Sequence, residues 1–406
     1  MNNLKPYKMG DILNIKHGFP FLGEFFSDKG DYIILTPGNF FEAGGFKRVE
    51  GKEKFYLAEF PEEYLCSKGD LVVAMTQQAE GLLGSTALIP EDNIYLHNQR
   101  IGLISFNEKR TNKLYLYYLF MTPWVRQQIR ATASGSKVKH TSPERIYDVK
   151  VWLPSLPQQK AIASFIYNID QKIQLNNTIN AELEKAAKTL YSYWFVQFDF
   201  PNAKGKPYRT SGGKMEYNEV LKREIPKGWK AERFIDLATI TTGKEDANFA
   251  TSDGTYNFFT CGRDILRCDK PAFSGQAVLL AGNGDFNVKH YTGEFNAYQR
   301  TYVLTPKHSA HYAAMYIAAS DKVAELKMGA YGSIVKFITM SDVANIALPV
   351  NHEYNYLFEK LTVIINEIEL LERENDELKK LRDFLLPLLM NGQVKVREGK
   401  DGLNHG

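Results

Sequence analysis

The 406-residue sequence has few cysteines, no long apolar run and almost no net charge. Its three cysteines, Cys66, Cys261 and Cys268, lack Cys-x-x-Cys spacing, which argues against a disulfide framework or a zinc site. The N-terminal residues contain no apolar segment typical of a secretory signal. No stretch of about 18 uncharged apolar residues exists that could span a membrane. We therefore expect a cytoplasmic protein whose thiols are reduced.

Common catalytic patterns are also missing. The sequence contains no GxxxxGKS or GxxxxGKT phosphate-binding loop, and its histidines show no HExxH spacing for a metal. Gly282-Asn283-Gly284 is a lone GxG that no helical pattern follows, so a turn is favoured over a nucleotide cradle. The net charge of +3 is by itself weak evidence for a polyanionic partner.

The sequence does contain a strict alternation of four- and three-residue steps, and the run occurs twice. This is the a/d spacing of a coiled coil, whereas an amphipathic helix on a globular core, the alternative for either run alone, drifts toward a 3.6-residue period. The first run consists of Ile162, Ile166, Ile169, Ile173, Asn176, Asn180, Leu183, Ala187, Leu190 and Trp194. The second run lies 195 residues later and consists of Leu357, Leu361, Ile364, Ile368, Leu371, Asn375, Leu378, Arg382, Leu385 and Leu389.

The two runs are expected to pack on each other as antiparallel helices. If their steps interlock, Asn176 faces Asn375. A buried Asn is costly unless it meets a polar partner, so a matched pair can fix the register of the two helices. Arg382 would then lie beside Ile169 and extend its guanidinium to solvent.

The segments before the two helices also resemble each other. Short motifs recur in the same order at offsets of 200, 197 and 195 residues. They are Gln99-Arg100 with Gln299-Arg300, Gly135-Ser136-Lys137-Val138-Lys139 with Gly332-Ser333-Ile334-Val335-Lys336, and Leu153-Pro154 with Leu348-Pro349. The repetition indicates two copies of one unit, each a globular segment followed by a long helix.

The local patterns predict an α+β fold. Strand-like runs bounded by turn residues occur at 32–35 and 70–75, and a helical stretch from Leu114 to Ile129 is interrupted near Pro123. We expect two similar mixed α/β domains separated by two long antiparallel helices that form a coiled coil, related by a pseudo-twofold internal repeat. The expected boundaries are 1–153 for the first domain, 154–200 for the central helix, 201–351 for a connector plus the second domain, 352–392 for the C-terminal helix and 393–406 for a tail.

The start of the first long helix is similar to that of a known family. Leu153-Pro154-Ser155-Leu156-Pro157-Gln158-Gln159-Lys160-Ala161-Ile162 resembles the beginning of the central helix in specificity (S) subunits of type I restriction–modification systems. The duplicated globular–helix order and the Gly-Asp-Leu-Val strand at 69–72 extend the resemblance to nearly the whole chain. It implies two target recognition domains, each reading one half of a split DNA sequence, with the helices setting the spacing.

The resemblance also implies partners and a non-catalytic role. The partners would be double-stranded DNA, two methyltransferase (M) subunits that dock on the helical pair, and restriction (R) subunits, without a membrane. S-adenosylmethionine, together with ATP and Mg²⁺ for restriction, would be used by the partner subunits and not bound by this chain. The sequence agrees, because it has no Asn-Pro-Pro-Tyr or Asp-Pro-Pro-Tyr type motif for amino-methylation.

Candidate DNA-binding residues follow from the chemistry of base edges. Arg suits guanine, Gln and Asn suit adenine, and Lys and hydroxyl groups suit phosphates. Residues 100–140 hold eight Lys or Arg and one acid, Glu108. For each candidate a solvated loop residue is the alternative, and Arg100 and Arg300 could instead pair with carboxylates. The candidates are Thr76, Gln77, Gln78, Arg100, Ser134, Ser136, Lys137, Lys139 and His140 in the first domain, and Asn283, Asn287, Lys289, Arg300, Tyr331, Ser333 and Lys336 in the second.

Two functions from other classes remain open at this point. One is a structural coiled-coil adaptor without DNA specificity, which salt-sensitive binding of duplex DNA by the assembled complex would exclude. The other is an unrecognised DNA-cleaving enzyme. An inert chain that supports methylation only with a partner subunit would exclude it.

Overall fold

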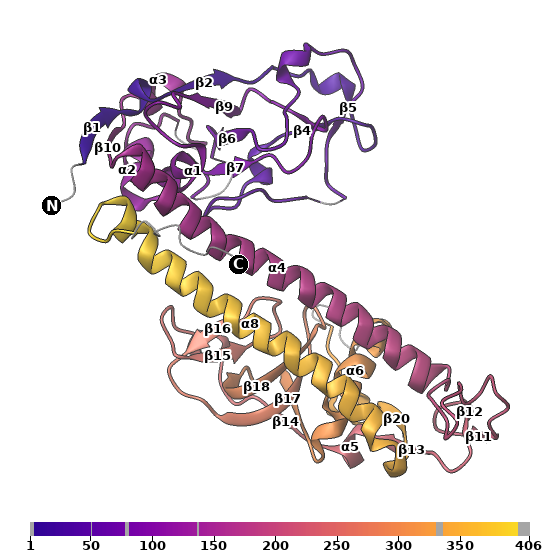
Figure 1. Cartoon of the computed structure of the whole chain (residues 1–406). Helices are drawn as coiled ribbons and strands as arrows, with labels where there is room; N and C mark the ends of the chain where they lie inside the picture. Colours follow the sequence, from indigo (N-terminus) through magenta and orange to yellow (C-terminus); the bar gives the residue numbers. More distant parts are fainter. Residues whose placement is uncertain (1–3, 50, 78–80, 136–137, 330–335, 397–406) are drawn as a thin grey trace, which may run out of the picture. The chain divides into compact units, whose positions relative to one another are not determined.

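The computed structural model describes residues 4–49, 51–77, 81–135, 138–329 and 336–396 (Figure 1). The chain divides into two compact units, Met1–Ile173 with Glu377–Gly406 (unit 1) and Gln174–Asp376 (unit 2). Each unit contains a β-rich domain and part of both long helices, α4 (Leu156–Tyr191) and α8 (Asn355–Met390). None of the helices in the described ranges has the length and apolarity of a membrane span.

The domain of unit 1 is built on two small sheets. The first has the order β2-β9-β6-β7, with all neighbours antiparallel. Its strand β6 is buried at all four positions, which explains its continuous apolar sequence. The strands of this sheet are β2 (Leu13–His17), β6 (Leu71–Ala74), β7 (Thr86–Leu88) and β9 (Ile101–Phe106). The second sheet, in the order β3-β5-β4-β8, comprises β3 (Phe26–Ser27), β4 (Ile33–Ile34), β5 (Phe55–Tyr56) and β8 (Tyr95–Leu96).

The first and last strands of this domain pair with each other. β1 (Lys5–Lys8) is antiparallel to β10 (Lys150–Leu153), with Lys5 opposite Leu153. The helical stretch interrupted near Pro123 forms two helices, α1 (Lys113–Met121) and α2 (Pro123–Ala131). Pro123 occupies the start of α2, where its missing N–H costs nothing. A short helix, α3 (Pro143–Tyr147), precedes β10.

The domain of unit 2 has one larger sheet, in the order β14-β19-β17-β18-β15-β16. Only the β15–β18 pair is parallel among these described strands. The strands are β14 (Ala238–Thr242), β15 (Tyr256–Phe259), β16 (Leu266–Cys268), β17 (Phe273–Ala281), β18 (Val288–Ala297) and β19 (Thr301–Pro306). As in unit 1, the end strands pair: β13 (Lys230–Arg233) is antiparallel to β20 (Ala347–Val350).

The remaining elements of unit 2 cover this sheet or connect it to α4. A π-helical turn (Ser192–Val196) ends α4, and the connector then forms a hairpin of β11 (Met215–Asn218) and β12 (Arg223–Pro226). The other helices are α5 (Phe234–Leu237), α6 (Tyr312–Gly329) and α7 (Met340–Ala344).

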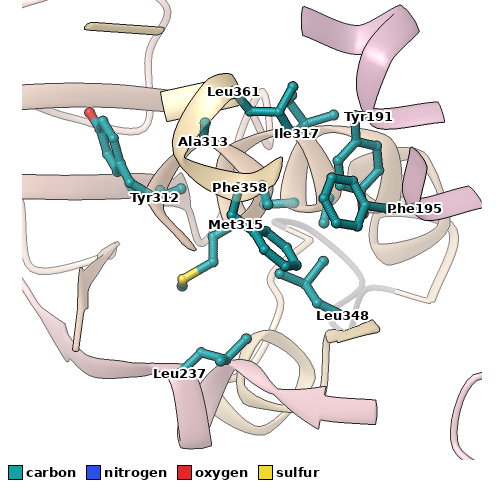
Figure 2. Close-up of a cluster of buried hydrophobic side chains, with 14 of the residues drawn as sticks. Tyr191, Phe195, Leu237, Tyr312, Ala313, Met315, Ile317, Leu348, Phe358 and Leu361 are labelled. Atoms are coloured by element: carbon teal, nitrogen blue, oxygen red, sulfur yellow. The ribbon is translucent and has the colours of Figure 1, made fainter. Parts of the chain in front are cut away.

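The core of unit 2 is formed largely by helices, as Figure 2 shows. Tyr312 and Met315 of α6 are buried together with Phe358 of α8 and Phe195 of the π-helical turn. The Phe195 and Phe358 rings lie 4.3 Å apart between centroids. Each such side chain contributes about 1.5–3 kcal/mol when fully buried. The start of α8 and the end of α4 therefore belong to the same core as the domain.

The two long helices pack antiparallel. In unit 1, Ile162 and Ile166 of α4 share a core with Leu386 and Leu389 near the end of α8. In unit 2, Ala187 and other residues near the end of α4 share a core with residues of the first turns of α8. The predicted fold class, two mixed α/β domains with an antiparallel pair of long helices, is confirmed.

Two details of the helix pair differ from the sequence prediction. The Arg382 guanidinium does not extend to solvent beside Ile169, because it pairs with Asp170 at 2.9 Å, and Asp170 also accepts a hydrogen bond from the Tyr118 hydroxyl at 2.6 Å. The buried face of α8 in unit 2 is also wider than the predicted seam. It includes the neighbouring residues Phe358 and Glu369, since this half of α8 packs on α6 as well as on α4.

Candidate nucleic-acid interface

Three segments of unit 1 that are far apart in sequence meet where β6 ends. The Met75 N–H donates to the Arg100 carbonyl at 3.0 Å, and the Thr141 N–H donates to the Met75 carbonyl at 2.9 Å. The Gln77 N–H donates to the Lys139 carbonyl at 2.9 Å. The loop after β6, the turn at Arg100 and the stretch that ends at Thr141 therefore form one surface.

The side chains on this surface fall into two groups. The Thr76 hydroxyl lies 3.0 Å from His140 Nδ1, and the backbones of His140 and Ser134 exchange two hydrogen bonds. These groups hold the segments together. Arg100 and Lys139 are exposed, and Arg100 makes no ion pair with a carboxylate in the part of the chain that the structure describes. These two cations are available to a polyanion.

Unit 2 repeats this backbone arrangement where β17 ends. The Gly282 N–H donates to the Arg300 carbonyl at 2.8 Å, and the Ile338 N–H donates to the Gly282 carbonyl at 3.0 Å. Asn283 forms an antiparallel bridge with Phe337, as Thr76 does with His140 in unit 1. The Arg100 and Arg300 turns thus occupy equivalent places in the two units.

Two candidates of unit 2 are already bonded within the domain. The Lys289 ammonium donates to the Gly262 carbonyl and to the Asn287 side-chain oxygen, both at 2.5 Å. The Asn287 amide donates to the Cys261 carbonyl at 2.8 Å. Burial lowers the pKa of Lys289, against the opposing influence of Cys261 and nearby acids. These two side chains join the start of β18 to the loop at 260–262.

The other candidates of unit 2 are distributed as follows. Asn283 is half-buried, whereas Arg300 and Lys336 are exposed. Gln78, Ser136, Lys137, Tyr331 and Ser333 lie outside the described residues. Among the residues that are described, no three His, Cys, Asp or Glu side chains gather as a possible metal site.

The structure brings Asn176 and Asn375 together inside the helix pair. The Asn176 amide donates to the Asn375 side-chain oxygen at 2.9 Å and to Glu374 Oε2 at 2.8 Å. The Asn375 amide donates to the Asn177 side-chain oxygen at 2.9 Å. Asn176 is 0% exposed and Asn375 is 3% exposed. Both amide groups of the pair are therefore hydrogen-bonded at a buried position, whereas Asn176 Oδ1 has no hydrogen-bond partner among the described residues.

The sequence reasoning missed one residue beside the surface of unit 1. Arg126 of α2 is buried, and its guanidinium donates to the main-chain carbonyls of Gly81 at 2.7 Å and Glu42 at 2.6 Å. Its place between the apolar Val125 and Ile129 was a possible signal, since a solvated arginine would be expected on the opposite face of the helix.

Comparisons with known proteins agree with this architecture. Residues 1–185 match the family model of the type I restriction modification DNA specificity domain. The chain is 37% identical to the EcoDI specificity subunit of Escherichia coli over 42% of this chain and 40% of that protein. It is 22% identical to the HindI specificity subunit of Haemophilus influenzae over 97% of this chain and 100% of that protein.

A solved structure shows the same fold. The type I restriction–modification S subunit from M. genitalium aligns with a TM-score of 0.63 at 14% identity, over 96% of each chain. The repeated domain and the antiparallel helix pair agree with the DNA specificity domain whose family model matches residues 1–185.

The chain is similar to specificity subunits of type I restriction–modification systems, and the family model matches its residues 1–185. Such a subunit is the non-catalytic component that recognises the DNA target. The family predicted from the sequence is confirmed, although the EcoDI match spans less than half of that relative.

Proposed function

We propose that each unit reads one half of a split DNA target through the surface at the end of β6 or β17. The observation that carries this proposal is the repeated set of backbone bonds, which presents Arg100 in unit 1 and Arg300 in unit 2 at equivalent places. Arginine pairs in bidentate geometry with guanine, and Gln77 and Asn283 have the amide groups that suit adenine. Lys139 and Lys336 suit phosphates. The remaining sequence candidates stay part of the proposed surface.

The proposed domains keep the boundaries drawn from the sequence. Residues 1–153 and 201–351 contain the two target recognition domains, the second with its connector. Residues 154–200 and 352–392 are the helices, and residues 393–406 are a tail. Each proposed recognition domain is closed by an antiparallel pair of end strands, β1 with β10 or β13 with β20.

The helix pair is proposed to set the unread gap between the half-sites. α4 and α8 have 36 residues each, which corresponds to about 54 Å at roughly 1.5 Å per residue. This length exceeds one turn of B-DNA, about 34 Å. The Asn176–Asn375 pair is proposed to fix the register of the two helices and therefore the length of the gap.

The outer faces of the helices are proposed to dock two methyltransferase subunits. Leu175 of α4 and Leu370 of α8 are 54% and 53% exposed and lie 195 residues apart, at equivalent places in the repeat. Two similar apolar stripes suit two copies of one partner. The other exposed apolar residues of these stripes are Phe165, Ile179, Val363, Leu381 and Phe384.

The assembled enzyme is proposed to act on double-stranded DNA in the cytoplasm. The methyltransferase subunits would bring S-adenosylmethionine, and restriction subunits would use ATP and Mg²⁺. This chain would contribute the sequence reading alone.

The proposal is tested by mapping methylated adenines in cells that carry the methyltransferase subunits with variants of this chain. We expect Arg100→Ala to change one half-site and Arg300→Ala to change the other, because loss of a bidentate pair removes about 1–3 kcal/mol of base discrimination. Lys109→Ala is the matched control, since this exposed residue follows the opposite end of β9. A motif that stays unchanged with both arginine variants contradicts the proposal.

A further inference from the structure

The loops that follow β6 and β17, which carry the candidates Gln77 and Asn283, differ in length. In unit 1 the connection runs from the end of β6 at Ala74 to the start of β7 at Thr86. In unit 2 it runs from the end of β17 at Ala281 to the start of β18 at Val288. A longer loop has more conformations to lose when it is ordered. The loop of unit 1 therefore needs more internal support.

Arg126 supplies this support in unit 1. Its guanidinium donates to the carbonyls of Gly81 at 2.7 Å and Leu83 at 3.4 Å, both in the loop. It also donates to the Glu42 carbonyl at 2.6 Å and to the Phe120 carbonyl at the end of α1 at 2.9 Å. One buried side chain thus connects the loop to a second loop and to a helix.

The chemistry of Arg126 favours a fixed geometry. The side chain is 6% exposed, and no described carboxylate forms an ion pair with it. Burial, and secondarily Arg130, lowers its pKa to about 10, against the influence of Glu42, so it remains charged at neutral pH. A buried charge must keep its hydrogen bonds. The carbonyls that Arg126 binds are therefore held in place.

The loop also packs closely on α2. Leu83 is fully buried, and Gly84 has a φ of +79°. A Cβ at Gly84 would lie 2.9 Å from Ile129 Cδ1, so the backbone approaches the helix as only glycine permits. On the other side of residues 78–80, Gln77 is bonded to Lys139. Both described parts of the loop are thus attached to the domain.

Unit 2 holds its shorter loop in a different way. Phe286 is 2% exposed and packs in the core of the domain. Its φ of +50° is unusual for a residue with a large side chain. The Ala281 N–H donates to the Asn287 carbonyl at 2.9 Å and closes the loop around Phe286. At the offset of 197 residues, Val323 takes the place of Arg126.

We infer that Arg126 in unit 1 and Phe286 in unit 2 are positioning residues that determine half-site specificity without touching DNA. The inference rests on the proposed function. Arg126 holds Gly81 and Leu83 of the loop that carries Gln77, and Phe286 packs in the core beneath the loop that carries Asn283. Each is specific to its unit, so the loss of one disturbs one half of the target alone.

The experiment uses the complete methyltransferase complex and maps its methylated motif. For Arg126→Gln we expect methylation at sites with an altered first half-site to rise about tenfold relative to the normal site, with the second half-site unchanged. Phe286→Ala is expected to give the reverse pattern. Phe286→Leu is expected to restore most of the selectivity, and Arg126→Lys only part of it, because an ammonium cannot donate to all four carbonyls at once. A purely structural role would lower methylation at all sites equally.

Arg130→Gln is the matched control. This exposed residue of α2 makes one weaker hydrogen bond, 3.3 Å, to the same Gly81 carbonyl, and its loss is expected to leave the motif unchanged. If the Arg126→Gln complex does not assemble, Gly81→Ala disturbs the same loop from outside, because its Cβ would lie 3.0 Å from Glu42 Oε2 and its φ is +93°. An unchanged motif with Gly81→Ala then overturns the inference.

The inference and the proposed function fail in different ways. If Arg100→Ala changes a half-site but Arg126→Gln does not, the positioning role is wrong and the proposed function stands. If Arg100→Ala, Arg300→Ala and Arg126→Gln all leave the motif unchanged, the proposed function itself is wrong.

Discussion

His97 lies three residues before Arg100 and is completely buried. Its Nε2 lies 2.8 Å from the Ile101 carbonyl, which fits a neutral ring that donates this bond. Burial, and to a smaller extent Lys16 and His17, lowers the pKa of His97 from 6.5 to about 4, although the bond to Ile101 opposes this shift. The turn that presents Arg100 thus depends on an uncharged histidine.

We expect this histidine to make unit 1 sensitive to acid. The pKa is lower in the folded state, so its contribution is complete above pH 6.5 and is lost as the pH falls toward 4. Between pH 6.5 and 5 the free energy of unfolding should fall by about 2 kcal/mol because of this residue. Urea unfolding at pH 7 and pH 5 should show a smaller difference for His97→Gln than for the wild type. An equal difference in both proteins would rule out His97 as a source of the acid sensitivity.

Unit 2 also contains a buried histidine, His311, at a different place in the domain. Burial, together with His308 and His352, lowers its pKa to about 4. His311→Gln should therefore reduce the acid sensitivity of unit 2 and leave that of unit 1 unchanged.

At the scale of residues, the hydrogen-bond partners of individual side chains were the least predictable feature. The recurrence of the same motifs in the same order, at offsets of 195 to 200 residues, identified Arg100 and Arg300 as equivalent. The sequence could not show that Lys289 donates to groups of its own domain or that Arg126 is buried on carbonyls. Both results depend on which backbone oxygens lie nearby, and residue type does not encode this.

The helix pair was predictable as an element, including the contact between Asn176 and Asn375. The 4-3 spacing fixes which positions face each other. The second buried face of α8 could not be predicted, because Glu369 has the charge of a solvated residue. In the structure it accepts hydrogen bonds from the Tyr312 hydroxyl at 2.5 Å and from His290 at 2.9 Å. A carboxylate is stable there only because the domain supplies those donors.

We expect the Asn176–Asn375 pair to lower the stability of the helix pair relative to an apolar pair and to fix its register. Asn375→Leu leaves the Asn176 amide without one of its two acceptors and should lower the free energy of unfolding by about 1–3 kcal/mol. The double variant Asn176→Leu with Asn375→Leu should restore or exceed wild-type stability, because an apolar pair fits the seam. Denaturant unfolding of the wild type, Asn176→Leu, Asn375→Leu and the double variant measures this coupling. Destabilisation of the double variant by the sum of the two single effects would show that the pair is not coupled.

The register role of this pair has its own readout. With the double Leu variant, the methylated sites should include more than one gap length. A single gap length would mean that the apolar seam alone sets the register.

At the scale of the whole molecule, the length of the helix pair should determine the gap in the DNA target. We expect insertion of one heptad after Asn177 in α4 and another before Glu374 in α8 to lengthen the pair by about 10.5 Å. This equals about three base pairs. Mapping of methylated adenines should show both half-sites unchanged and the gap longer by that amount. An unaltered gap would separate the helices from the spacing function.

A single insertion serves as the control. A heptad added to α4 alone mismatches the two helices beyond the insertion and should abolish methylation.

The internal repeat itself was evident from the sequence, since the same motifs recur in order. How each domain holds its loop was not evident from the sequence. Arg126 does so by hydrogen bonds to carbonyls, whereas Phe286 does so by apolar packing in the core.

β1 pairs with β10, and β13 pairs with β20, so the first and last strands of each domain lie side by side. The chain therefore enters and leaves each domain at one place, while side chains of the domain also pack on the long helices. We expect a gene fragment encoding that interior to be exchangeable for a related one if the replacement keeps the side chains that contact the helices. Under the proposed function, such a recombination would change one half of the DNA preference and leave the other half as it was.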